Sequence, residues 1–184
     1  MTAAELERRR AQALAYLRRA GIVITPDEAA KLEVADLGLG RFDEVGLTLL
    51  TYVNTERVCA KELVLLPRQL CPEHRHPAIG GEPGKEETFR CRWGRVHLVV
   101  DRPAASTPPL PDHPYLRSGH VTAAHHVVLE PGEQYMIEPD LLHWFMAGPE
   151  GAVVSEFSTR SRDAFDVFTD PRVDRNPVDG SAEG

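Results

Sequence analysis

The sequence has little cysteine and no long apolar run. Three cysteines, Cys59, Cys71 and Cys91, are spread over 184 residues, and none of them forms a C-x-x-C pair. An odd number at these spacings argues against a disulfide framework, and no signal-peptide pattern opens the chain. We therefore expect a reducing, cytoplasmic setting. No apolar stretch approaches the roughly 18 residues that cross a bilayer, which predicts a soluble protein.

The sequence also lacks an excess of positive charge. It has 28 acidic and 21 basic residues, which gives a net charge of −7. This balance argues against nucleic acid or an anionic membrane as the main partner. A run of three arginines at 8–10 falls on the polar side of a predicted helix, and we interpret it as a solvated helix face. We also find no internal repeat, phosphate-binding glycine loop or serine nucleophile elbow.

The N-terminal part of the chain has two helix signals. Strong helix formers fill residues 3–20, with a narrow apolar stripe along one face. The stripe consists of Leu6, Ala13, Leu14 and Leu17. Thr25, Pro26 and Glu28 then supply a capping residue, a first-turn proline and a capping-box glutamate. They predict a second, shorter helix that ends near Leu32.

After Gly40 the pattern changes from helical to β. Short apolar or β-rich runs are bounded by glycine, proline or asparagine, and with no helix predicted between them they favour an antiparallel sheet. The runs are 46–53, 57–66, 95–100, 125–146 and 152–159. One domain suffices for this length. We divide it into a helical extension (1–45), a barrel (46–160) and a C-terminal tail (161–184) that covers the barrel to about Pro171.

Residues 101–119 hold many of the prolines and predict a long connection. A loop of this length in a small domain tends to be functional or disordered. Its polar and aromatic side chains could line a substrate mouth, but the flanking prolines favour ordinary surface positions. These residues are His113, Tyr115, Arg117 and His120.

Two histidines in the stretch 71–94 have the spacing of metal ligands. Alternate side chains of a strand share a face, so His74 and His76 are expected about 6 to 7 Å apart on one side, where they can bind one ion. Residues 77–85 contain two prolines and three glycines, a composition that reverses the chain. We therefore expect the strand that begins near Glu87 to pair with the first as an antiparallel hairpin.

Glu87 shares a face with apolar residues if this second strand alternates regularly. One face then carries Glu87, Phe89, Cys91 and Trp93, and the other carries Thr88, Arg90 and Arg92. A carboxylate on an apolar face is costly unless a cation compensates it, and an ion held with the two histidines would do so. The alternative is a polar hairpin with solvated histidines and a salt-bridged glutamate.

His143 and Glu156 are further candidates in the later β-forming runs. A lone histidine between Leu142 and Trp144 is usually a core residue bonded to a carbonyl. In a barrel, however, its strand could bring a third imidazole across the lumen and complete a set of three histidines and one glutamate. Glu156 is either an outward-facing or an inward-facing carboxylate, and the pattern leaves both open.

The candidate ligands occur in segments that resemble the two cupin motifs. HRH at 74–76 with Glu87 and Gly94 is similar to the first motif, and PGEQYMIEPDLLHWF, which contains His143, is similar to the second. Strand alternation and the spacing to Gly94 favour Glu87 over Glu86 as the carboxylate of the first motif. CPEHRHP, GEPGKEETFRCRWG and VVSEFSTRS further resemble the cupin-type D-lyxose isomerases, and this likeness spans nearly the whole chain.

The resemblance implies a mainly β fold, a cupin (double-stranded β-helix or jelly-roll) barrel with an N-terminal helical extension. It implies a monosaccharide substrate, with interconversion of D-lyxose and D-xylulose and, as a related pair, of D-mannose and D-fructose. It also implies a divalent metal, manganese first and cobalt, iron or zinc as alternatives. A homodimer formed through a sheet edge is part of the same expectation.

The resemblance also assigns roles to individual residues. The implied metal ligands are His74, His76, Glu87 and His143. Glu156 is implied as the base that moves a proton between C1 and C2 of the sugar. Lys85 either acts on the substrate oxygens or merely belongs to the turn. Two other classes stay open, an iron dioxygenase and a non-catalytic sugar-binding cupin, but the polar Lys85 and Glu156 suit a sugar better than an aromatic compound.

Overall fold

The structure is a computed structural model that describes residues 1–103 and 108–175. Within them, α1 (Ala3–Arg19) and α2 (Pro26–Ala30) precede the sheet, and η1 (Pro114–Ser118) and η2 (Asp163–Phe165) are short 3-10 helices. The strands are β1 (Glu33–Ala35), β2 (Leu47–Asn54), β3 (Cys59–Leu65), β4 (Leu70–Arg75), β5 (Glu87–Val100), β6 (His125–Leu129), β7 (Gln134–Ile137), β8 (His143–Ser158) and β9 (Val167–Phe168). The fold is mainly β, as the sequence predicts.

Both α-helices begin with a capping box. The side chains of Thr2 and Thr25 accept hydrogen bonds from the backbone N–H groups of Glu5 and Glu28, whose carboxylates bond back to the cap residues. α1 agrees with the prediction, whereas α2 ends earlier than predicted, at Ala30. In the described part of the chain, no helix combines the length and the apolar character that crossing a bilayer requires.

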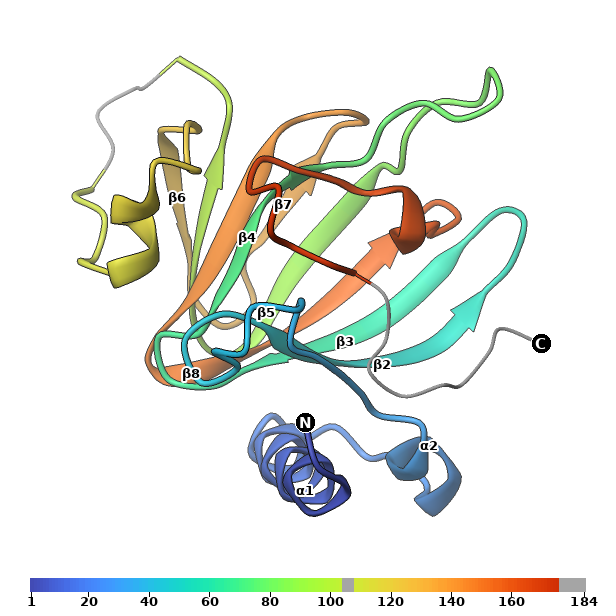
Figure 1. The fold of residues 1–184 in the computed structure, drawn as a ribbon. Coiled ribbons are helices and arrows are strands. Elements are labelled where there is room, and N and C mark those ends of the chain that lie inside the picture. The colour runs from blue at the N-terminus through green and yellow to red at the C-terminus, as the bar shows by residue number, and fades with distance from the viewer. Residues whose placement is uncertain (104–107, 176–184) are drawn as a thin grey trace.

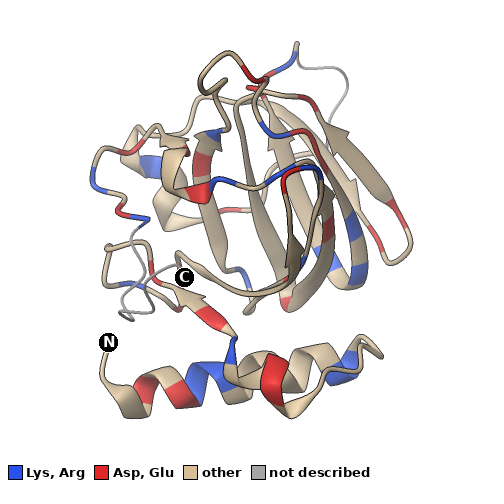
Figure 2. Cartoon of the chain, turned by 90° about the vertical axis from the view of Figure 1, so that its right-hand side faces the viewer, with Lys and Arg blue, Asp and Glu red and all other residues tan. Residues whose placement is uncertain are grey.

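The arginine run in α1 does more than face the solvent, which corrects the prediction. Arg9 forms an ion pair with Asp43 and lies over the ring of Phe42, 5.0 Å from its centroid. Arg10 donates a hydrogen bond to the carbonyl oxygen of Leu32. Acidic and basic positions are intermixed along the helix (Figure 2). Arg10 therefore fastens α1 to the residues just after α2, and Arg9 fastens it to the connection between β1 and β2.

One long strand, β8, organises the sheet. Its first half pairs with β4 on one side and with the second half of β5 on the other, and its second half pairs with β3 and the first half of β5. β2 and β1 continue the sheet beyond β3, β9 lies beyond β4, and β6 and β7 pair with β5. These pairings are antiparallel, and the sheet curls around an apolar interior (Figure 1). This is the cupin barrel that the resemblance implies.

The predicted hairpin between β4 and β5 is wrong. In the described chain β4 pairs with β8 and β9, and β5 pairs with β6, β7 and β8. His143 of β8 lies opposite His74 of β4 on one side and opposite Val100 of β5 on the other. The residues between β4 and β5 therefore join two strands that flank β8. A long strand inserted from a distant part of the chain has no local sequence signal, which is why the local turn composition was misleading.

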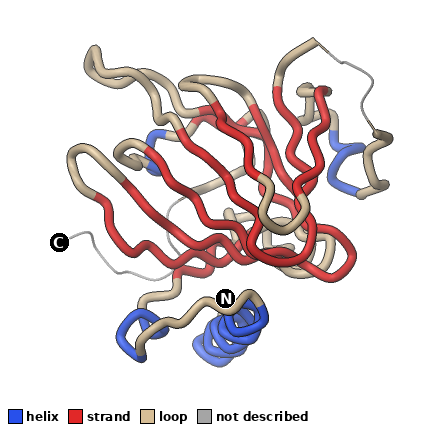
Figure 3. Tube along the Cα trace, turned by 180° about the vertical axis from the view of Figure 1, so that it is seen from behind, coloured by secondary structure: helices blue, strands red, loops and turns tan. Residues whose placement is uncertain are grey.

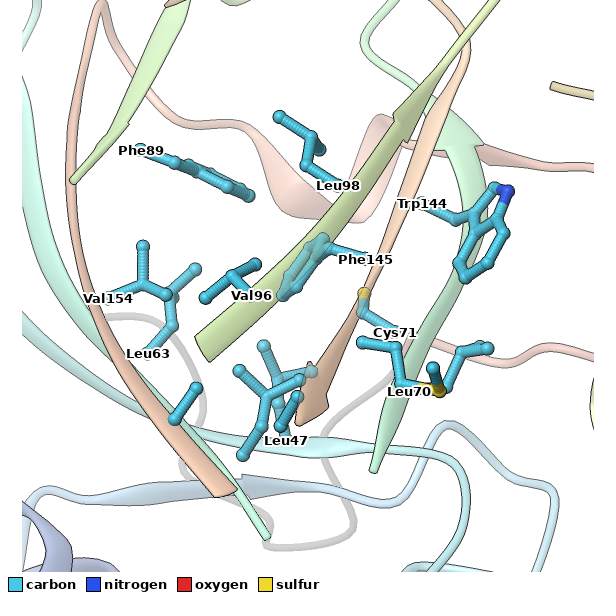
Figure 4. Packing of buried hydrophobic residues seen from close by; sticks show 14 of the residues in the cluster. Leu47, Leu63, Leu70, Cys71, Phe89, Val96, Leu98, Trp144, Phe145 and Val154 are labelled. Carbon is cyan, nitrogen blue, oxygen red and sulfur yellow. The ribbon is translucent and has the colours of Figure 1, made fainter. Parts of the chain in front are cut away.

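Apolar side chains pack on both faces of the sheet. The interior cluster includes Phe89, Phe145 and Val154, whose side chains enter the same space, while Trp144 leaves its strand on the opposite side from Phe145 (Figure 4). A second cluster lies between the sheet and the helices, which cover one side of it (Figures 1 and 3). Its buried members are Ala13, Leu17, Leu32, Leu50, Val64 and Val153. Each fully buried leucine there contributes about 2 kcal/mol.

Trp93 departs from the predicted alternation of β5. The register shifts between Cys91 and Trp93, so Cys91 stays in the interior while Trp93 packs against the outer cluster. Its ring meets Tyr16 of α1 edge-on, with 5.4 Å between the centroids. Before this bulge Glu87 and Phe89 keep their predicted inward positions. A β-bulge changes the face of every later residue, and the sequence carried no sign of it.

The proline-rich connection packs tightly on the barrel. Tyr115 and His113 are buried, which contradicts the predicted surface positions, whereas Arg117 is exposed. The hydroxyl of Tyr115 donates to Asp170 at 2.9 Å, and His113 caps η1 by accepting a hydrogen bond from the N–H of Tyr115. Residues 104–107 of this connection lie outside the described residues.

The C-terminal segment 161–175, here called the C-terminal strap, lies against the barrel beside β4. It contains η2 and the short strand β9, which pairs with β4. The sequence loses its β pattern here and predicted a tail that covers the barrel to about Pro171 without a strand, so β9 was missed, as was β1. The last residues of the predicted tail, 176–184, lie outside the described residues.

Candidate active site

Three histidines meet inside the barrel, and two of them, His74 and His76, line a cavity there. His74 on β4 and His143 at the start of β8 are register partners, and His76 follows directly after the end of β4. One ring nitrogen of each lies within 4.8 Å of the other two, and all three side chains are buried. One ion can contact three nitrogens at this spacing. The structure thus brings together the predicted pair and the predicted third imidazole.

The Nδ1 atoms of these histidines are all engaged on the side away from the cluster. Nδ1 of His74 lies 2.8 Å from the carbonyl oxygen of Pro72, and Nδ1 of His143 lies 2.9 Å from that of Leu141. Nδ1 of His76 lies 2.6 Å from a carboxylate oxygen of Asp166. Because these oxygens only accept, each Nδ1 carries a hydrogen, so each ring presents the lone pair of Nε2 whenever that ring is neutral. That is the tautomer a metal ligand needs.

Glu87 directs its carboxylate at the same nitrogens. Its Oε1 lies 3.2 Å from Nε2 of His76 and 3.1 Å from Nε2 of His143. The latter nitrogen is buried and makes no hydrogen bond of acceptable geometry. Two acceptors that face each other in a buried site repel unless a proton or a cation lies between them. Three imidazoles and one carboxylate in this arrangement therefore fit a divalent metal ion.

Burial and mutual charge shift the pKa values of this cluster. Burial lowers the pKa of His74 well below its usual range, and the neighbouring rings add to the effect. Burial alone would raise the pKa of Glu87, but Lys85 and His76 outweigh it and hold that pKa well below normal. Burial also opposes a charge on His76, yet its pKa is raised to about 9 because Glu87 and Asp166 favour the protonated ring. A bound cation would take the place of that proton.

Lys85 links the histidine cluster to Glu156. Its Nζ lies 2.7 Å from Oε2 of Glu87 and 3.2 Å from Oε1 of Glu156, and all three side chains are buried. Burial alone would lower the pKa of Lys85, but the carboxylates of Glu156 and Glu87 raise it well above its ordinary value, so the amine is charged. Glu156 faces inwards on β8, the second of the two orientations that the sequence left open.

The turn before β5 sets the position of Lys85. A Cβ on Gly84 would lie 1.8 Å from the carbonyl oxygen of His76, so glycine is required for the two backbones to approach this closely. The approach brings Lys85 next to the ligand cluster. Glu86 is exposed, and Glu87 is buried at 2% of its accessible surface. Of these two carboxylates, Glu87 is therefore the one that faces the histidine cluster.

Other walls of the cavity come from residues that the sequence did not indicate. Lys61 on β3 is the register partner of Glu156, and its ammonium donates to Ser161 at 2.8 Å and to Asp163 at 2.6 Å. The strap further contributes Asp166, Phe168 and Arg175. Acids in an aperiodic polar tail look like solvated groups, so no local signal pointed to them. In contrast, no described residue of the 101–119 connection lines this cavity.

The fold and the site define a class of protein. This is a cupin barrel with a buried cluster of three imidazoles and one carboxylate suited to a divalent metal, next to a lysine–glutamate pair. No protein-family model matches the sequence. The chain is 59% identical over 162 residues to the D-lyxose ketol-isomerase of Cohnella laeviribosi, covering 88% of each protein. It is 56% identical over 161 residues to the D-lyxose/D-mannose isomerase of Thermosediminibacter oceani, again covering 88% of each. The chain belongs to the D-lyxose ketol-isomerase family.

Solved structures with a similar fold are more distant in sequence. The L-ribose isomerase of Cellulomonas parahominis superimposes with a TM-score of 0.77 at 16% identity, covering 94% of each chain. The L-ribose isomerase of Geodermatophilus obscurus gives a TM-score of 0.71 at 18% identity, covering 99% of this chain and 94% of the other. These likenesses establish the barrel and the helical extension as one shared architecture.

Proposed function

We propose that the cavity is the active site of a metal-dependent aldose–ketose isomerase that interconverts D-lyxose and D-xylulose, with D-mannose and D-fructose as a second pair. The observation that carries this proposal is the convergence of the histidine cluster and Glu87 beside the Lys85–Glu156 pair, next to one cavity that most of these residues line. The names of the two relatives, at more than half identity, support the choice of sugars.

The metal ligands in this proposal are His74, His76, Glu87 and His143. The Nε2 lone pairs and the unpaired buried nitrogen of His143 support the assignment. When bound, the ion would act as a Lewis acid that stabilises negative charge on two adjacent sugar oxygens. We propose manganese as the native ion, because a mixed nitrogen and carboxylate set suits it; cobalt, iron and zinc suit the same donors.

Glu156 is the proposed base. Its carboxylate takes the proton from C2 of the aldose, which leaves an enediolate with negative charge on O1. A second proton then passes from O2 to O1, and the carboxylate returns its own proton to C1 to give the ketose. In the reverse direction the same carboxylate removes the proton from C1 and returns it to C2. Its burial on the inner face of β8 and its contact with Lys85 support this role, because a proton held there is shielded from exchange with bulk water.

Lys85 is the proposed electrostatic partner of this proton transfer. Its ammonium lies between the carboxylates of Glu87 and Glu156, so it is on the path between the ligand cluster and the base. A cation here donates hydrogen bonds to sugar oxygens as negative charge develops on them. The polar wall formed by Lys61, Asp163 and Arg175 suits a polyhydroxylated substrate better than an aromatic one.

The substitution Glu156→Gln tests the proposal. It keeps the size of the side chain and removes the base, so the purified variant should bind metal like the wild type and lose isomerisation by a factor of about 10³ or more. Metal content is measured by elemental analysis and turnover by the conversion of D-lyxose in the presence of manganese. Normal turnover in this variant would remove Glu156 from the mechanism, and turnover insensitive to a chelator would remove the metal.

We further propose a homodimer in a reducing, cytoplasmic setting. Val53, Phe157 and Met136 are exposed and lie in one row across the outer face of the sheet, which supports association of two copies. The three cysteines are free and buried, which supports a reducing compartment. Light scattering of the wild type and of Phe157→Glu tests the dimer, which the charged residue should weaken.

A further inference from the structure

The three clustered histidines differ in what holds their rings. His74 and His143 each bond through Nδ1 to a backbone carbonyl two residues earlier in the chain. His76 instead bonds to the side chain of Asp166, 90 residues later. Two rings are thus oriented by their own local backbone, and the third depends on a distant segment. This asymmetry makes His76 the ligand whose geometry the rest of the fold can alter.

The contact between His76 and Asp166 is short and shielded from water. Nδ1 and the carboxylate oxygen lie 2.6 Å apart, and the two side chains are exposed by only 6% and 10%. A charge-assisted hydrogen bond of this length in a buried site strongly fixes the donor, so it selects the tautomer with Nε2 free. It also makes Nε2 a better electron-pair donor, as a carboxylate behind a ligating imidazole generally does.

Asp166 is held in place by the docking of the C-terminal strap on β4. Phe168 and Val167 of β9 lie opposite His74 and Arg75, and the N–H of Thr169 donates to the carbonyl oxygen of Glu73 at 3.0 Å. The ring of Phe168 also stacks on His74 with 5.2 Å between centroids and 30° between planes. Two of the three clustered histidines therefore touch the same short segment.

Ion pairs fasten the strap on either side of Asp166. Asp163 pairs with the buried Lys61 at 2.6 Å, and Arg175 pairs with Glu33 of β1. Residues of the segment between these two attachments line the cavity. Because both ends are anchored to other strands, the strap presents Asp166 to His76 at one defined place.

We propose that Asp166 is a positioning residue for His76, and that metal binding and docking of the C-terminal strap are coupled through it. The inference rests on the metal site of the proposed function and goes beyond it. Coupling of this kind is reciprocal: a docked strap strengthens metal binding, and bound metal strengthens docking by the same factor. Asp166 touches neither sugar nor metal in this scheme and acts only through the ring of His76.

The first test is a titration of full-length apoprotein with Mn²⁺. The electron paramagnetic resonance signal of the free ion reports how much Mn²⁺ stays unbound at each point. Asp166→Ala should weaken Mn²⁺ binding by about 10- to 100-fold. Asp166→Asn keeps an acceptor oxygen without the charge and should fall between the alanine variant and the wild type. Asp140→Asn is the matched control, because it removes the same charge from a carboxylate that pairs with Arg75, the residue before His76. Unlike Asp166, Asp140 is not bonded to the ring of His76 in the structure. It should bind Mn²⁺ within about twofold of the wild type.

The second test measures the strap itself by hydrogen exchange of a peptide covering residues 163–169. In the wild type, saturating Mn²⁺ should slow exchange in this peptide. In Asp166→Ala, at a Mn²⁺ concentration raised to saturate the weakened site, the metal-dependent slowing should be lost. A purely structural role for Asp166 would change exchange equally with and without metal. If alanine prevents folding, the near-isosteric asparagine variant carries both tests.

The outcomes separate this inference from the proposed function. Normal Mn²⁺ affinity in Asp166→Ala, or unchanged metal-dependent protection of the strap, overturns the coupling and leaves the isomerase proposal intact. A wild type that binds Mn²⁺ with the predicted coupling but does not isomerise sugars supports the coupling and overturns the function. A wild type that binds none of Mn²⁺, Co²⁺, Fe²⁺ and Zn²⁺ overturns both.

Discussion

Two groups of buried histidines in this barrel behave differently. In the first, the Nε2 atoms of His74, His76 and His143 converge and a carboxylate joins them. In the second, Nδ1 of His97 lies 3.0 Å from Nε2 of His126, whose Nδ1 lies 2.9 Å from the carbonyl oxygen of Pro108. The carbonyl only accepts, so His126 donates to it through Nδ1 and accepts from His97 through Nε2.

The difference lies in the direction of the anchoring bonds, since both groups are buried and both lie on strands or directly beside one. In the first group each Nδ1 is tied outwards, so each Nε2 presents a lone pair to a common point. In the second group the rings are tied to each other, and their bonds hold the proline-rich connection on the sheet. Several buried imidazoles therefore do not by themselves make a metal site. What makes one is that each Nδ1 is bonded away from the cluster, so that each Nε2 is directed at a common point.

The largest effect is expected when a ligand of the first group is removed. His74→Ala should reduce bound Mn²⁺ from roughly one ion per chain to below about a tenth, because the remaining donors leave the ion under-coordinated. Elemental analysis after dialysis measures it. His126→Ala is the matched control from the second group and should keep full stoichiometry. Equal metal loss in both variants would mean that the comparison reflects general destabilisation.

Sequence reasoning identified the chemistry of the first group better than its architecture. The spacing of His74 and His76 and the burial of Glu87 on an apolar strand were readable, because they depend on local alternation. The pairing of β4 with β8 was not, since the partner strand begins at His143, far along the chain. Asp166 was not readable either, because an acid in an aperiodic segment acquires its role only when the strap docks.

The second group had no distinctive signal at all. His97 and His126 stand in apolar runs, as His143 does, and the sequence gives no means to tell a ligand from a core residue bonded to a carbonyl. The structure shows His143 to be both, since its Nδ1 bonds to a carbonyl while its Nε2 faces the cluster. Its place in a late strand of the expected barrel made His143 a candidate, and the cupin resemblance then implied it as a ligand.

A smaller effect should follow from breaking the second group. His126→Leu removes the acceptor for the buried Nδ1–H of His97 and the donor to the carbonyl of the exposed Pro108. The free energy of unfolding should fall by about 1 to 3 kcal/mol, because one buried donor is left without a partner. Guanidinium unfolding with a chelator present measures this without a contribution from metal. His125→Leu is the control, because His125 is only partly buried and makes one bond, to the Pro103 carbonyl. It should cost about 1 kcal/mol or less. Similar losses would contradict the role given to the pair.

The smallest effect is a pH dependence that sets the two groups apart. Burial lowers the pKa of His97 to about 4. The nearby His126, Arg95 and Arg68 lower this pKa further, and Glu130 acts in the opposite direction. In the unfolded chain the pKa of this histidine is near 6.5. Between about pH 4 and pH 6.5 the unfolded chain therefore binds a proton at His97 that the folded protein does not bind. Stability from this group is therefore complete above about pH 6.5 and is lost as the pH falls towards 4.

The free energy of unfolding is measured for the wild type and for His97→Gln, both with a chelator present, at several pH values between about 7.5 and 4.5. Glutamine can still donate to His126 but does not titrate. The wild type should lose about 1 to 2 kcal/mol more than the variant over this range, a figure reduced for solvent screening. If the two curves run parallel, His97 takes up its proton as readily in the folded state as in the unfolded one. The His97–His126 pair would then be an ordinary solvated contact and not a buried pair to compare with the histidine cluster.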